Sequence, residues 1–219
     1  MAAREGEFQI ETEINLEHLN KEHKGIIEEM MAPYKPMRNC PTPIQMKILV
    51  KDEQPVCHRP RRVAYSDQKL IENQLAEWLQ DGIIRPSVSP YASPIVLVGK
   101  KDGTKRMCCD FRKVNEKIIR DKYSMPLIDD VVERLQKTVV FTTLDLKDGF
   151  FHVPMERASA KYTAFVTKIG QYEFNFVPFG ICNSPAVFTR FIMAVMRNFI
   201  QDGTMVLCMN DMVISATYE

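Results

Sequence analysis

The stretch MVLCMNDMVIS, Met205 to Ser215, decides how the chain folds near its end and where its chemistry would lie. Two apolar runs of strand composition flank Asn210 and Asp211, which predicts a β-hairpin with this polar pair at its bend. The turn alone could explain the carboxylate, because Asn and Asp tolerate the backbone angles of tight turns. Alternatively, Asp211 is a metal ligand.

A second carboxylate stands in a similar position. Residues 139–146, VVFTTLDL, have the composition of a buried strand that ends in Asp145, and a buried charge needs partners because it is costly to leave unpaired. If this strand and the hairpin are neighbours, Asp145 and Asp211 converge at one edge of a sheet and could share Mg²⁺. Two metal ions can stabilise both the attacking and the leaving oxygen of a phosphoryl transfer. Turn and helix-cap explanations of the two acids remain open at this point.

Length and composition describe an ordinary globular protein. The 219 residues, 45% hydrophobic and 26% charged, are enough for one large domain or two modest ones. No apolar run approaches the roughly 20 residues that cross a bilayer, and MAAREGEFQI is too acidic for a signal peptide. We therefore expect an intracellular protein, in the cytoplasm or nucleus, that is neither secreted nor in a membrane. Cys40, Cys57 and His58 lack a fourth zinc ligand, so no zinc site is predicted.

Positive charge is concentrated in one segment. Residues 99–122 hold nine Lys or Arg against four Asp or Glu. Within this segment GKKDGTK joins two short strand-like runs, and its Asp-Gly pair predicts a hairpin. Four cations lie at its tip: Lys100, Lys101, Lys105 and Arg106. They would suit binding of phosphates, although cations also keep an exposed hairpin soluble.

The remaining pattern alternates strands with helices. We expect a strand over residues 8–14, strands over 161–167 and 172–177, and helices over 16–31, 66–80, 124–136 and 184–199. Ser66 is the expected N-cap of the second helix, Asp81-Gly82 its end, and Pro185 opens the last. Asp129 and Asp130 fit a first helical turn, where the helix dipole stabilises acids, so we assign them no catalytic role. The order of elements predicts an α+β fold with helices on one face of a sheet.

Four longer motifs indicate a family. They are PSVSPYASPIVLVGKKDGTKRMCCDFRKVN, FTTLDLKDGFFHVPM, KYTAFVTKIGQYEFNFVPFGICNSPAVFTRFIMAVM and VLCMNDMVIS. In order and spacing they resemble the reverse transcriptases of gypsy-type LTR retrotransposons and, more distantly, those of retroviruses. The resemblance covers about residues 40–217. It implies the right-hand polymerase fold with an antiparallel palm sheet, divided into a polyprotein-like lead-in (1–59), fingers (60–140) and a palm (141–219).

The resemblance also implies roles for individual residues. Asp145 and Asp211 would bind two Mg²⁺ ions, with Mn²⁺ as a possible substitute. Phe150 would lie under the sugar and select deoxynucleotides. The other implied contacts are Lys100 and Arg106 with the β- and γ-phosphates, the backbone of Lys147, Asp148 and Gly149 with the triphosphate, Phe179 and Gly180 with the nucleotide, and Asp110 and Arg112 with the template. His152 receives no such role. The implied partners are an RNA or DNA template with its primer, deoxynucleoside triphosphates, and other domains of the polyprotein.

One position departs from the family pattern. Where the family has Tyr-x-Asp-Asp, this chain has Cys208, Met209, Asn210 and Asp211. Asn210 is neutral, so the site loses one unit of charge, and loss of a comparable electrostatic element costs roughly 10²–10³ in rate. The chain stops at Glu219, without thumb or ribonuclease H, so we also expect primer grip and processivity to be absent. We therefore predict an impaired polymerase fragment; the alternatives are a non-catalytic nucleic-acid-binding remnant and a protein-contact module.

Overall fold

The computed structural model describes residues 21–33, 42–101, 103–124, 128–136, 138–146, 148–208 and 211–216. The chain forms two compact units, Met1–Pro41 and Thr42–Glu219. In the first unit, helix α1 spans Lys21–Met31 and buries none of its residues. The helix predicted over residues 16–31 is confirmed over this part, and the strand predicted over residues 8–14 lies outside the described residues. None of the described helices is both long and apolar enough to cross a bilayer.

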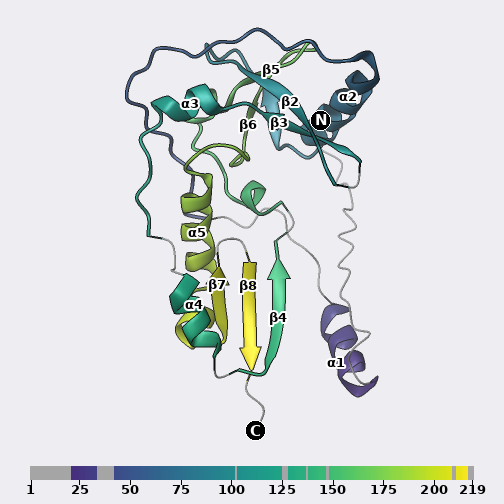
Figure 1. Cartoon of the computed structure of the whole chain (residues 1–219), viewed down its shortest axis with the longest axis vertical. Coiled ribbons are helices and arrows are strands. Elements are labelled where there is room, and N and C mark those ends of the chain that lie inside the picture. Colours follow the sequence, from purple (N-terminus) through teal and green to yellow (C-terminus); the bar gives the residue numbers. More distant parts are fainter. Residues whose placement is uncertain are drawn as a thin grey trace. The chain divides into compact units, whose positions relative to one another are not determined.

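A five-stranded sheet occupies one end of the larger unit (Figure 1). Its strands, in spatial order, are β1 (Ile84–Pro86), β6 (Gln171–Phe174), β5 (Phe165–Val166), β2 (Ser93–Gly99) and β3 (Lys105–Cys109). All neighbours are antiparallel except β2 and β5, which run parallel. Strands β1, β2 and β3 come from the range predicted as fingers, whereas β5 and β6 come from the range predicted as palm. This sheet therefore contains strands from both sides of the boundary predicted at residue 140.

The β2–β3 hairpin confirms the prediction from the Asp-Gly pair. Ile95 pairs with Cys109 and Gly99 with Lys105 at the two ends of the ladder. Gly103 has φ +82°, a conformation that favours glycine, and the Lys100 N–H donates to the Thr104 carbonyl at 2.7 Å. The strand predicted over residues 161–167 is wrong in its first half, which is the 3₁₀ helix η2 (Ala160–Thr163).

Helix α2 (Tyr65–Gln80) packs Ile71 and Leu75 into the core. It ends as predicted, at Asp81 and at Gly82 with φ +67°. The predicted N-cap is wrong: Ala64 takes that position, and Ser66 lies inside the first turn. A hydroxyl two residues after the N-cap cannot accept the first free amides, so this helix start depends on packing more than on a side-chain cap.

The core beneath α2 is aromatic. The Trp78 ring lies 5.5 Å from that of Phe174, 6.1 Å from Phe151 and 6.5 Å from Phe165, measured between ring centroids. Phe165 and Phe174 are almost completely buried. Edge-to-face and tilted ring pairs of this kind add stability beyond the area they bury.

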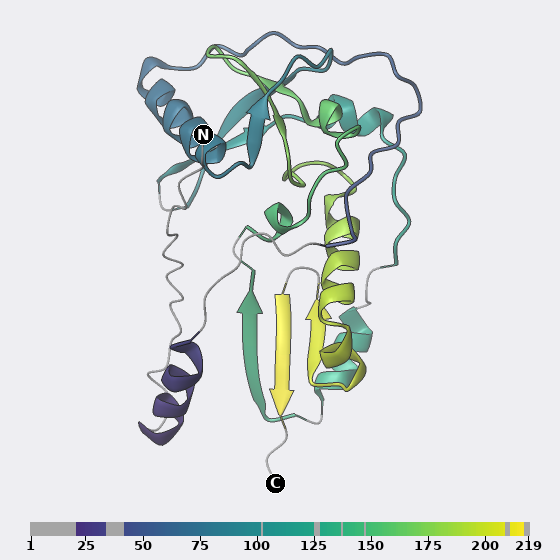
Figure 2. The ribbon, with the colours of Figure 1, turned by 180° about the vertical axis from the view of Figure 1, so that it is seen from behind.

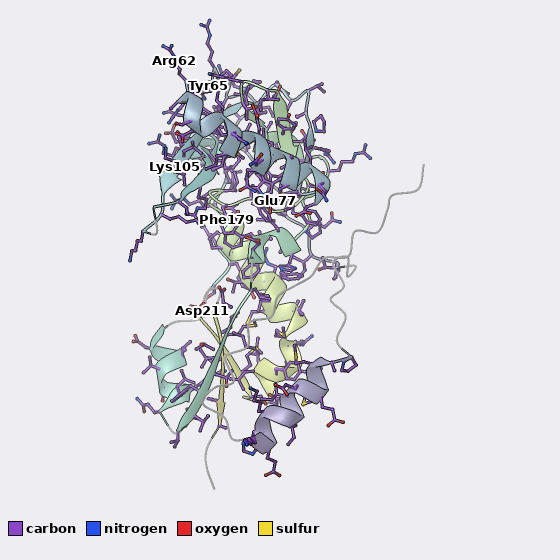
Figure 3. All side chains as sticks on the ribbon, turned by 90° about the vertical axis from the view of Figure 1, so that its right-hand side faces the viewer. Arg62, Tyr65, Glu77, Lys105, Phe179 and Asp211 are labelled. Atoms are coloured by element: carbon purple, nitrogen blue, oxygen red, sulfur yellow. The ribbon has the colours of Figure 1, made fainter. Side chains whose placement is uncertain are left out.

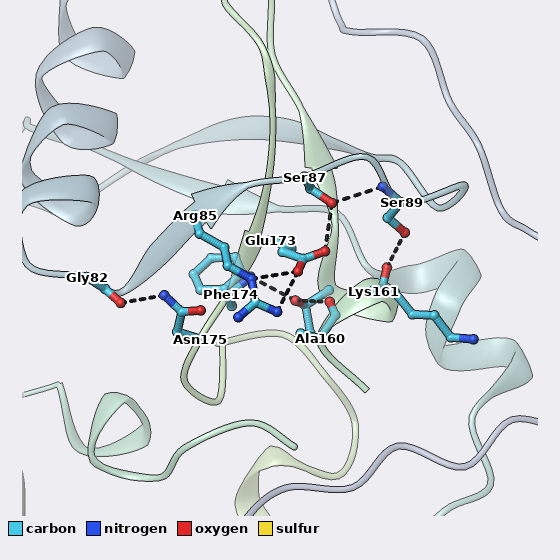
Figure 4. Close-up of polar contacts among 10 residues, drawn as sticks. Gly82, Arg85, Ser87, Ser89, Ala160, Lys161, Glu173, Phe174 and Asn175 are labelled. Atoms are coloured by element: carbon cyan, nitrogen blue, oxygen red, sulfur yellow. Dashed lines mark hydrogen bonds and ion pairs between the residues drawn. The ribbon is translucent and has the colours of Figure 1, made fainter. Parts of the chain in front are cut away.

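A polar network joins β1, β6 and η2 at the margin of this core (Figure 4). Arg85 and Glu173 face each other in the β1–β6 register, and the Arg85 Nε donates to Glu173 Oε1 at 2.8 Å. The Ser87 hydroxyl donates to the other carboxylate oxygen of Glu173 at 2.7 Å. The Ser89 hydroxyl donates to the Lys161 carbonyl at 2.7 Å. Segments about 80 residues apart in sequence are thereby held in one register.

A second sheet of three antiparallel strands lies at the other end of the unit, in the order β4-β8-β7 (Figure 2). Its strands are β4 (Val140–Asp145), β8 (Asp211–Ala216) and β7 (Met205–Cys208). Strands β7 and β8 form the hairpin predicted from MVLCMNDMVIS. Helices α4 (Ile128–Leu135) and α6 (Arg197–Gln201) contact β7. This is the antiparallel sheet with helices that the sequence predicts.

Strand β4 is not the buried strand that its composition predicts. All six of its residues are exposed, among them Phe141 at 50% and Leu144 at 40%. The reason is its place in the sheet: β4 is an edge strand next to β8, whereas the contacting helices lie at β7. Hydrophobicity alone cannot distinguish an edge strand from a central one.

The last long helix is two helices. Helix α5 spans Ser184–Val195 with Pro185 in its first turn, as predicted, and α6 follows after Met196. Phe188 and Ile192 are buried on the predicted face, whereas Val195 and Phe199 are about half exposed. The break at Met196, with φ −95° and ψ 16°, turns the residues after it off that face.

Residues 42–59, which the sequence assigns to the lead-in, belong to the larger unit. Met46 and Ile48 are buried. The Met46 N–H donates to the Pro154 carbonyl at 2.9 Å, and the Glu156 N–H donates to the Met46 carbonyl at 2.9 Å. The compact unit therefore begins near residue 42.

We predict that the turn leading from β4 to the 3₁₀ helix η1 (Gly149–His152) requires glycine at position 149. A Cβ there would lie 2.8 Å from Cζ of Phe188, a ring that is completely buried. Gly149→Ala should therefore lower the free energy of unfolding by about 1–3 kcal/mol. Urea denaturation followed by the fluorescence of Trp78 measures this. The control is Gly99→Ala, whose Cβ would meet nothing within 4 Å; equal losses in both variants would contradict the prediction.

Candidate active site

The two predicted carboxylates face each other in the smaller sheet. Asp145 ends β4, Asp211 begins β8, and the two residues are direct partners in the antiparallel register. Directly opposed residues of such a pair project from the same face, with Cβ atoms about 4.5–5.5 Å apart. Both carboxylates are exposed. The expectation that the two acids meet at one edge of a sheet is confirmed, and their role as metal ligands remains a prediction.

The two carboxylates suit a hard cation that completes its coordination shell with ligands from outside the protein. Among the described residues, no three or more His, Cys, Asp or Glu side chains are grouped so that they could hold a metal ion. Two opposed carboxylates nevertheless fit Mg²⁺, because this ion is usually bound by one or two carboxylates and completes its shell with water and substrate phosphates. Met209 and Asn210, which complete the hairpin bend, lie outside the described residues, as does Lys147.

The turn after Asp145 is tight and partly strained. Asp148 has φ 52°, and among the described residues it is the only one other than glycine with a positive φ. Backbone strain of this kind often lies at functional sites. The Gly149 N–H donates to the Leu146 carbonyl at 3.0 Å, and the Phe151 N–H to the Asp148 carbonyl at 2.8 Å. Of the amides predicted to meet a triphosphate, that of Gly149 is thus already hydrogen-bonded within the turn.

The rings of Phe150 and Phe179 contact each other at a tilt of 45° beside this turn. Phe150 is only 8% exposed, with its ring 4.8 Å from that of Phe179 and 5.3 Å from that of Phe188. Phe179 is 48% exposed. Figure 3 shows Phe179 between the level of Lys105 and that of Asp211. Phe150, expected under the sugar, is therefore mostly a core residue here, and Phe179 is the ring of this pair that faces solvent.

Asn115 holds the segment that carries Phe179, and sequence reasoning missed it. From helix α3 (Arg112–Lys117), its side-chain nitrogen donates to the Gly180 carbonyl at 2.8 Å, and its oxygen accepts the Cys182 N–H at 2.9 Å. Gly180 has φ +93°. The two partners lie 65 and 67 residues away in sequence, so no local pattern could have revealed them.

Asn183 makes a matching contact in the opposite direction. Its side-chain nitrogen donates to the Ile119 carbonyl at 2.9 Å, and its oxygen accepts the Asp121 N–H at 3.1 Å. Asp121 also forms an ion pair with Arg190 of α5 at 2.9 Å. Side chains from both segments thus connect the start of α5 to the segment after α3.

The basic hairpin carries fewer free cations than the sequence suggests. The Lys105 Nζ lies 2.8 Å from both carboxylate oxygens of Asp67 on α2. Lys105 therefore pairs with α2 and does not project with the others, which corrects the expectation of four projecting cations. Arg106 follows it in β3 and so points to the opposite face of the hairpin. Lys100, Lys101 and Arg106 are exposed.

Asp110 lies between two arginines. The Arg112 Nε donates to Asp110 Oδ1 at 2.8 Å and its Nη2 to Oδ2 at 2.7 Å, and the Arg61 Nη2 donates to the same Oδ2 at 2.6 Å. The hydrogen bonds from Arg112 hold the pKa of Asp110 far below its ordinary value of 3.8. Asp110 is 10% exposed, whereas Arg61 and Arg112 are 46% and 80% exposed. Sequence reasoning named Asp110 and Arg112 but missed Arg61, which comes from the segment before α2.

Comparison with known proteins shows the family of this chain. Residues 98–219 match the family described as reverse transcriptase (RNA-dependent DNA polymerase). The Pol polyprotein of transposon 297 from Drosophila melanogaster is 33% identical over 218 residues, which cover 94% of this chain and 20% of that protein. That of transposon gypsy is 38% identical over 165 residues, which cover 73% of this chain and 16% of that protein. The chain thus spans a fifth or less of the length of these relatives.

Solved structures show the same fold. The foamy viral protease–reverse transcriptase in complex with an RNA/DNA hybrid matches with a TM-score of 0.75 and 21% identity, covering 92% of this chain and 28% of that one. A prototype foamy virus protease–reverse transcriptase matches with a TM-score of 0.78 and 22% identity over the same shares. The expected polymerase fold is confirmed.

We predict that Asp110 stabilises the fold throughout the neutral range. Because its pKa is lowered in the folded state, its contribution is complete above the ordinary pKa of 3.8 and is lost as pH falls toward the folded-state value. Asp110→Asn should lower the Tm by roughly 2–4 °C at pH 7. The difference should be the same at pH 5 and should narrow only below about pH 4. A difference that closes between pH 7 and pH 5 would contradict this assignment.

We also predict that Asn115→Ala loosens the segment around Gly180. The variant leaves the Cys182 N–H without its acceptor, at a cost of about 1–3 kcal/mol for a partly buried group. Amide hydrogen exchange over residues 179–183 should become faster. The control is Asn198→Ala, at an exposed position of α6. If the amides of residues 179–183 exchange equally fast in both variants, Asn115 does not hold this segment.

Proposed function

Because the chain belongs to the reverse transcriptase (RNA-dependent DNA polymerase) family, we propose that it carries the nucleotide-joining site of a retrotransposon polyprotein. In the proposed reaction the 3′-hydroxyl oxygen of a primer attacks the α-phosphorus of a deoxynucleoside triphosphate. A phosphodiester bond forms and pyrophosphate leaves. The observation that supports this most directly is the register that makes Asp145 and Asp211 direct partners.

The two carboxylates would hold the divalent ions, Mg²⁺ or Mn²⁺. When bound, such ions stabilise charge on the attacking and leaving oxygens and orient the phosphates. Both acids lie at strand ends, where the backbone ladder fixes their separation. A site built on strands is more precise than one built on loops.

The nucleotide would lie between this pair and the basic hairpin. Lys100 and Arg106 are exposed cations suited to the β- and γ-phosphates. Exposed Phe179, supported by buried Phe150, presents an aromatic surface for the sugar or base. The Asn115 side chain donates to the Gly180 carbonyl and so holds the backbone next to Phe179. Selection against a 2′-hydroxyl would then depend on both rings, with Phe150 acting through the position of Phe179.

Asn210 would reduce the activity of this chain. The carboxylate that the family carries at this position is replaced here by a neutral amide. Coordination of two divalent ions therefore depends on one fewer negative charge. In other active sites, removing one group that stabilises the charge of the transition state lowers kcat roughly 10²–10³-fold.

We predict that Asn210→Asp raises primer extension by roughly 10²-fold or more. The assay uses a labelled primer on an RNA or DNA template, with deoxynucleotides and either Mg²⁺ or Mn²⁺. Asp145→Ala should abolish extension in both backgrounds. Asp129→Ala is the control, because this exposed acid lies on α4, away from the β4–β8 pair.

Three outcomes are informative. Loss of extension in Asp145→Ala but not in the control supports the polymerase site. Tight primer–template binding without extension, even in Asn210→Asp, would favour a nucleic-acid-binding remnant. Extension by the unmodified chain as fast as by Asn210→Asp would contradict the proposed effect of Asn210.

A further inference from the structure

The outer half of the β2–β3 hairpin lies outside the core. Every described residue from 98 to 106 is exposed, whereas Met107, the next residue of β3, is only 3% exposed. This half carries Lys100 and Arg106, the cations proposed to contact the β- and γ-phosphates. A two-stranded ribbon is marginally stable in water without a partner. The position of both cations therefore depends on what attaches the ribbon to the rest of the unit.

An ion pair attaches this half of the hairpin to helix α2. The Lys105 Nζ lies 2.8 Å from each of the two carboxylate oxygens of Asp67. Across the ladder Lys105 faces Gly99, which has no side chain that could support it. Asp67 is 18% exposed and Lys105 is 46% exposed. The lysine side chain is therefore held by α2 and not by the residue opposite it on β2.

Asp67 is a fixed point, because its helix is anchored in the core. It lies in the first turn of α2, where the helix dipole favours an acid, and its own N–H donates to the Ala64 carbonyl at 3.0 Å. One turn further along α2, Ile71 is 5% exposed, and Leu75 is 2% exposed one turn after that. The position of Asp67 thus follows from the packing of α2 and does not depend on the hairpin.

The pairing of Lys105 with α2 also determines which way Arg106 points. Successive side chains of a strand project to opposite faces, so Arg106 projects from the face that turns away from α2. Lys100 belongs to the same ribbon, since its N–H donates to the Thr104 carbonyl at 2.7 Å. A ribbon released from α2 would let both cations adopt many positions. Binding of a triphosphate would then cost more conformational entropy.

We propose that Asp67 and Lys105 are positioning residues for nucleotide binding. Their ion pair holds the β2–β3 hairpin against α2, and the hairpin then presents Lys100 and Arg106 to the triphosphate. This inference rests on the proposed function, which supplies the nucleotide. Because exposed ion pairs contribute little to overall stability, the pair acts on the position of the hairpin and not on the stability of the whole fold.

Two single substitutions separate positioning from the electric field of the two charges. Asp67→Asn removes a negative charge, so a field effect alone would tighten binding of an anionic triphosphate, whereas Lys105→Gln would weaken it. Loss of positioning weakens binding in both variants. We expect each variant to raise the KM for the deoxynucleotide by roughly 3–10-fold and to change kcat less than about 2-fold. Primer extension in the Asn210→Asp background, over a range of nucleotide concentrations, measures both constants.

Exchanging the two residues restores the contact with its charges reversed. Asp67→Lys combined with Lys105→Asp keeps the net charge of the chain and should return the KM to within about 2-fold of the Asn210→Asp parent. Asp67→Lys alone places two like charges together and should raise the KM further than Asp67→Asn does. A pair with a purely structural role would change the fraction of active protein, and hence kcat, while leaving the KM as it is. That result would contradict the proposal.

Glu77→Gln and Lys69→Gln are the matched controls, because they remove the same charges from exposed positions of the same helix. Glu77 lies toward the other end of α2 (Figure 3) and accepts a hydrogen bond from Gln74 of the same helix at 2.9 Å. Both controls should change the KM less than about 2-fold. Two results would overturn the proposal: KM values that move in opposite directions in Asp67→Asn and Lys105→Gln, or controls that move the KM as far.

Hydrogen exchange tests the attachment of the hairpin without catalysis. Amides of residues 98–106 should exchange severalfold faster in Asp67→Asn and Lys105→Gln than in Glu77→Gln and the unmodified chain, while the melting temperature changes little. Equal exchange in all four chains would overturn the proposal. If no chain extends a primer, even with Asn210→Asp, the proposed function fails and the role in nucleotide binding fails with it. Hydrogen exchange then still shows whether the pair holds the hairpin, so the two failures are distinguishable.

Discussion

The hydrogen-bond ladder between β4 and β8 determines which side chains meet where these strands end. Val140 pairs with Ala216 at one end and Asp145 with Asp211 at the other. Because side chains alternate between the faces of a sheet, a shift of one residue would send one carboxylate to the opposite face. The chemistry proposed for this chain therefore depends on a backbone register, which exposed β4 keeps through its pairing with β8.

The surroundings of this pair are arranged by contacts that are distant in sequence. The turn after Asp145 lies close to the buried ring of Phe188, and Phe150 fills the space between Phe188 and Phe179. Asn115 and Asn183 link the segment after β3 to the start of α5 in both directions. The surface proposed to face the nucleotide is thus supported by buried aromatic contacts and by side-chain to backbone hydrogen bonds.

The positions of nearby acids divide the cations into three groups. Lys105 is paired with Asp67 and stabilises the position of the β2–β3 hairpin against α2. Arg61 and Arg112 are also paired, but they share one carboxylate and keep surplus charge at the surface. Exposed Lys100 and Arg106 lie on the hairpin itself. Counting basic residues in the sequence cannot separate these kinds, because the difference depends on where the acids Asp67 and Asp110 lie in space.

The sequence alone determined the elements with strong local signals: the β7–β8 hairpin, the β2–β3 hairpin with its Asp-Gly turn, the end of α2 at Gly82, and the start of α5 at Pro185. It also determined the family, and with it the two acids. Each of these depends on short-range patterns of apolar residues and turn residues. Tertiary structure decided the rest: that β4 is an exposed edge strand, that Phe150 lies buried against Phe179, and that Arg61 donates to Asp110 and Asn115 to the Gly180 carbonyl. These features depend on neighbours 29 or more residues away in the sequence, and local sequence preference contains no information about such neighbours.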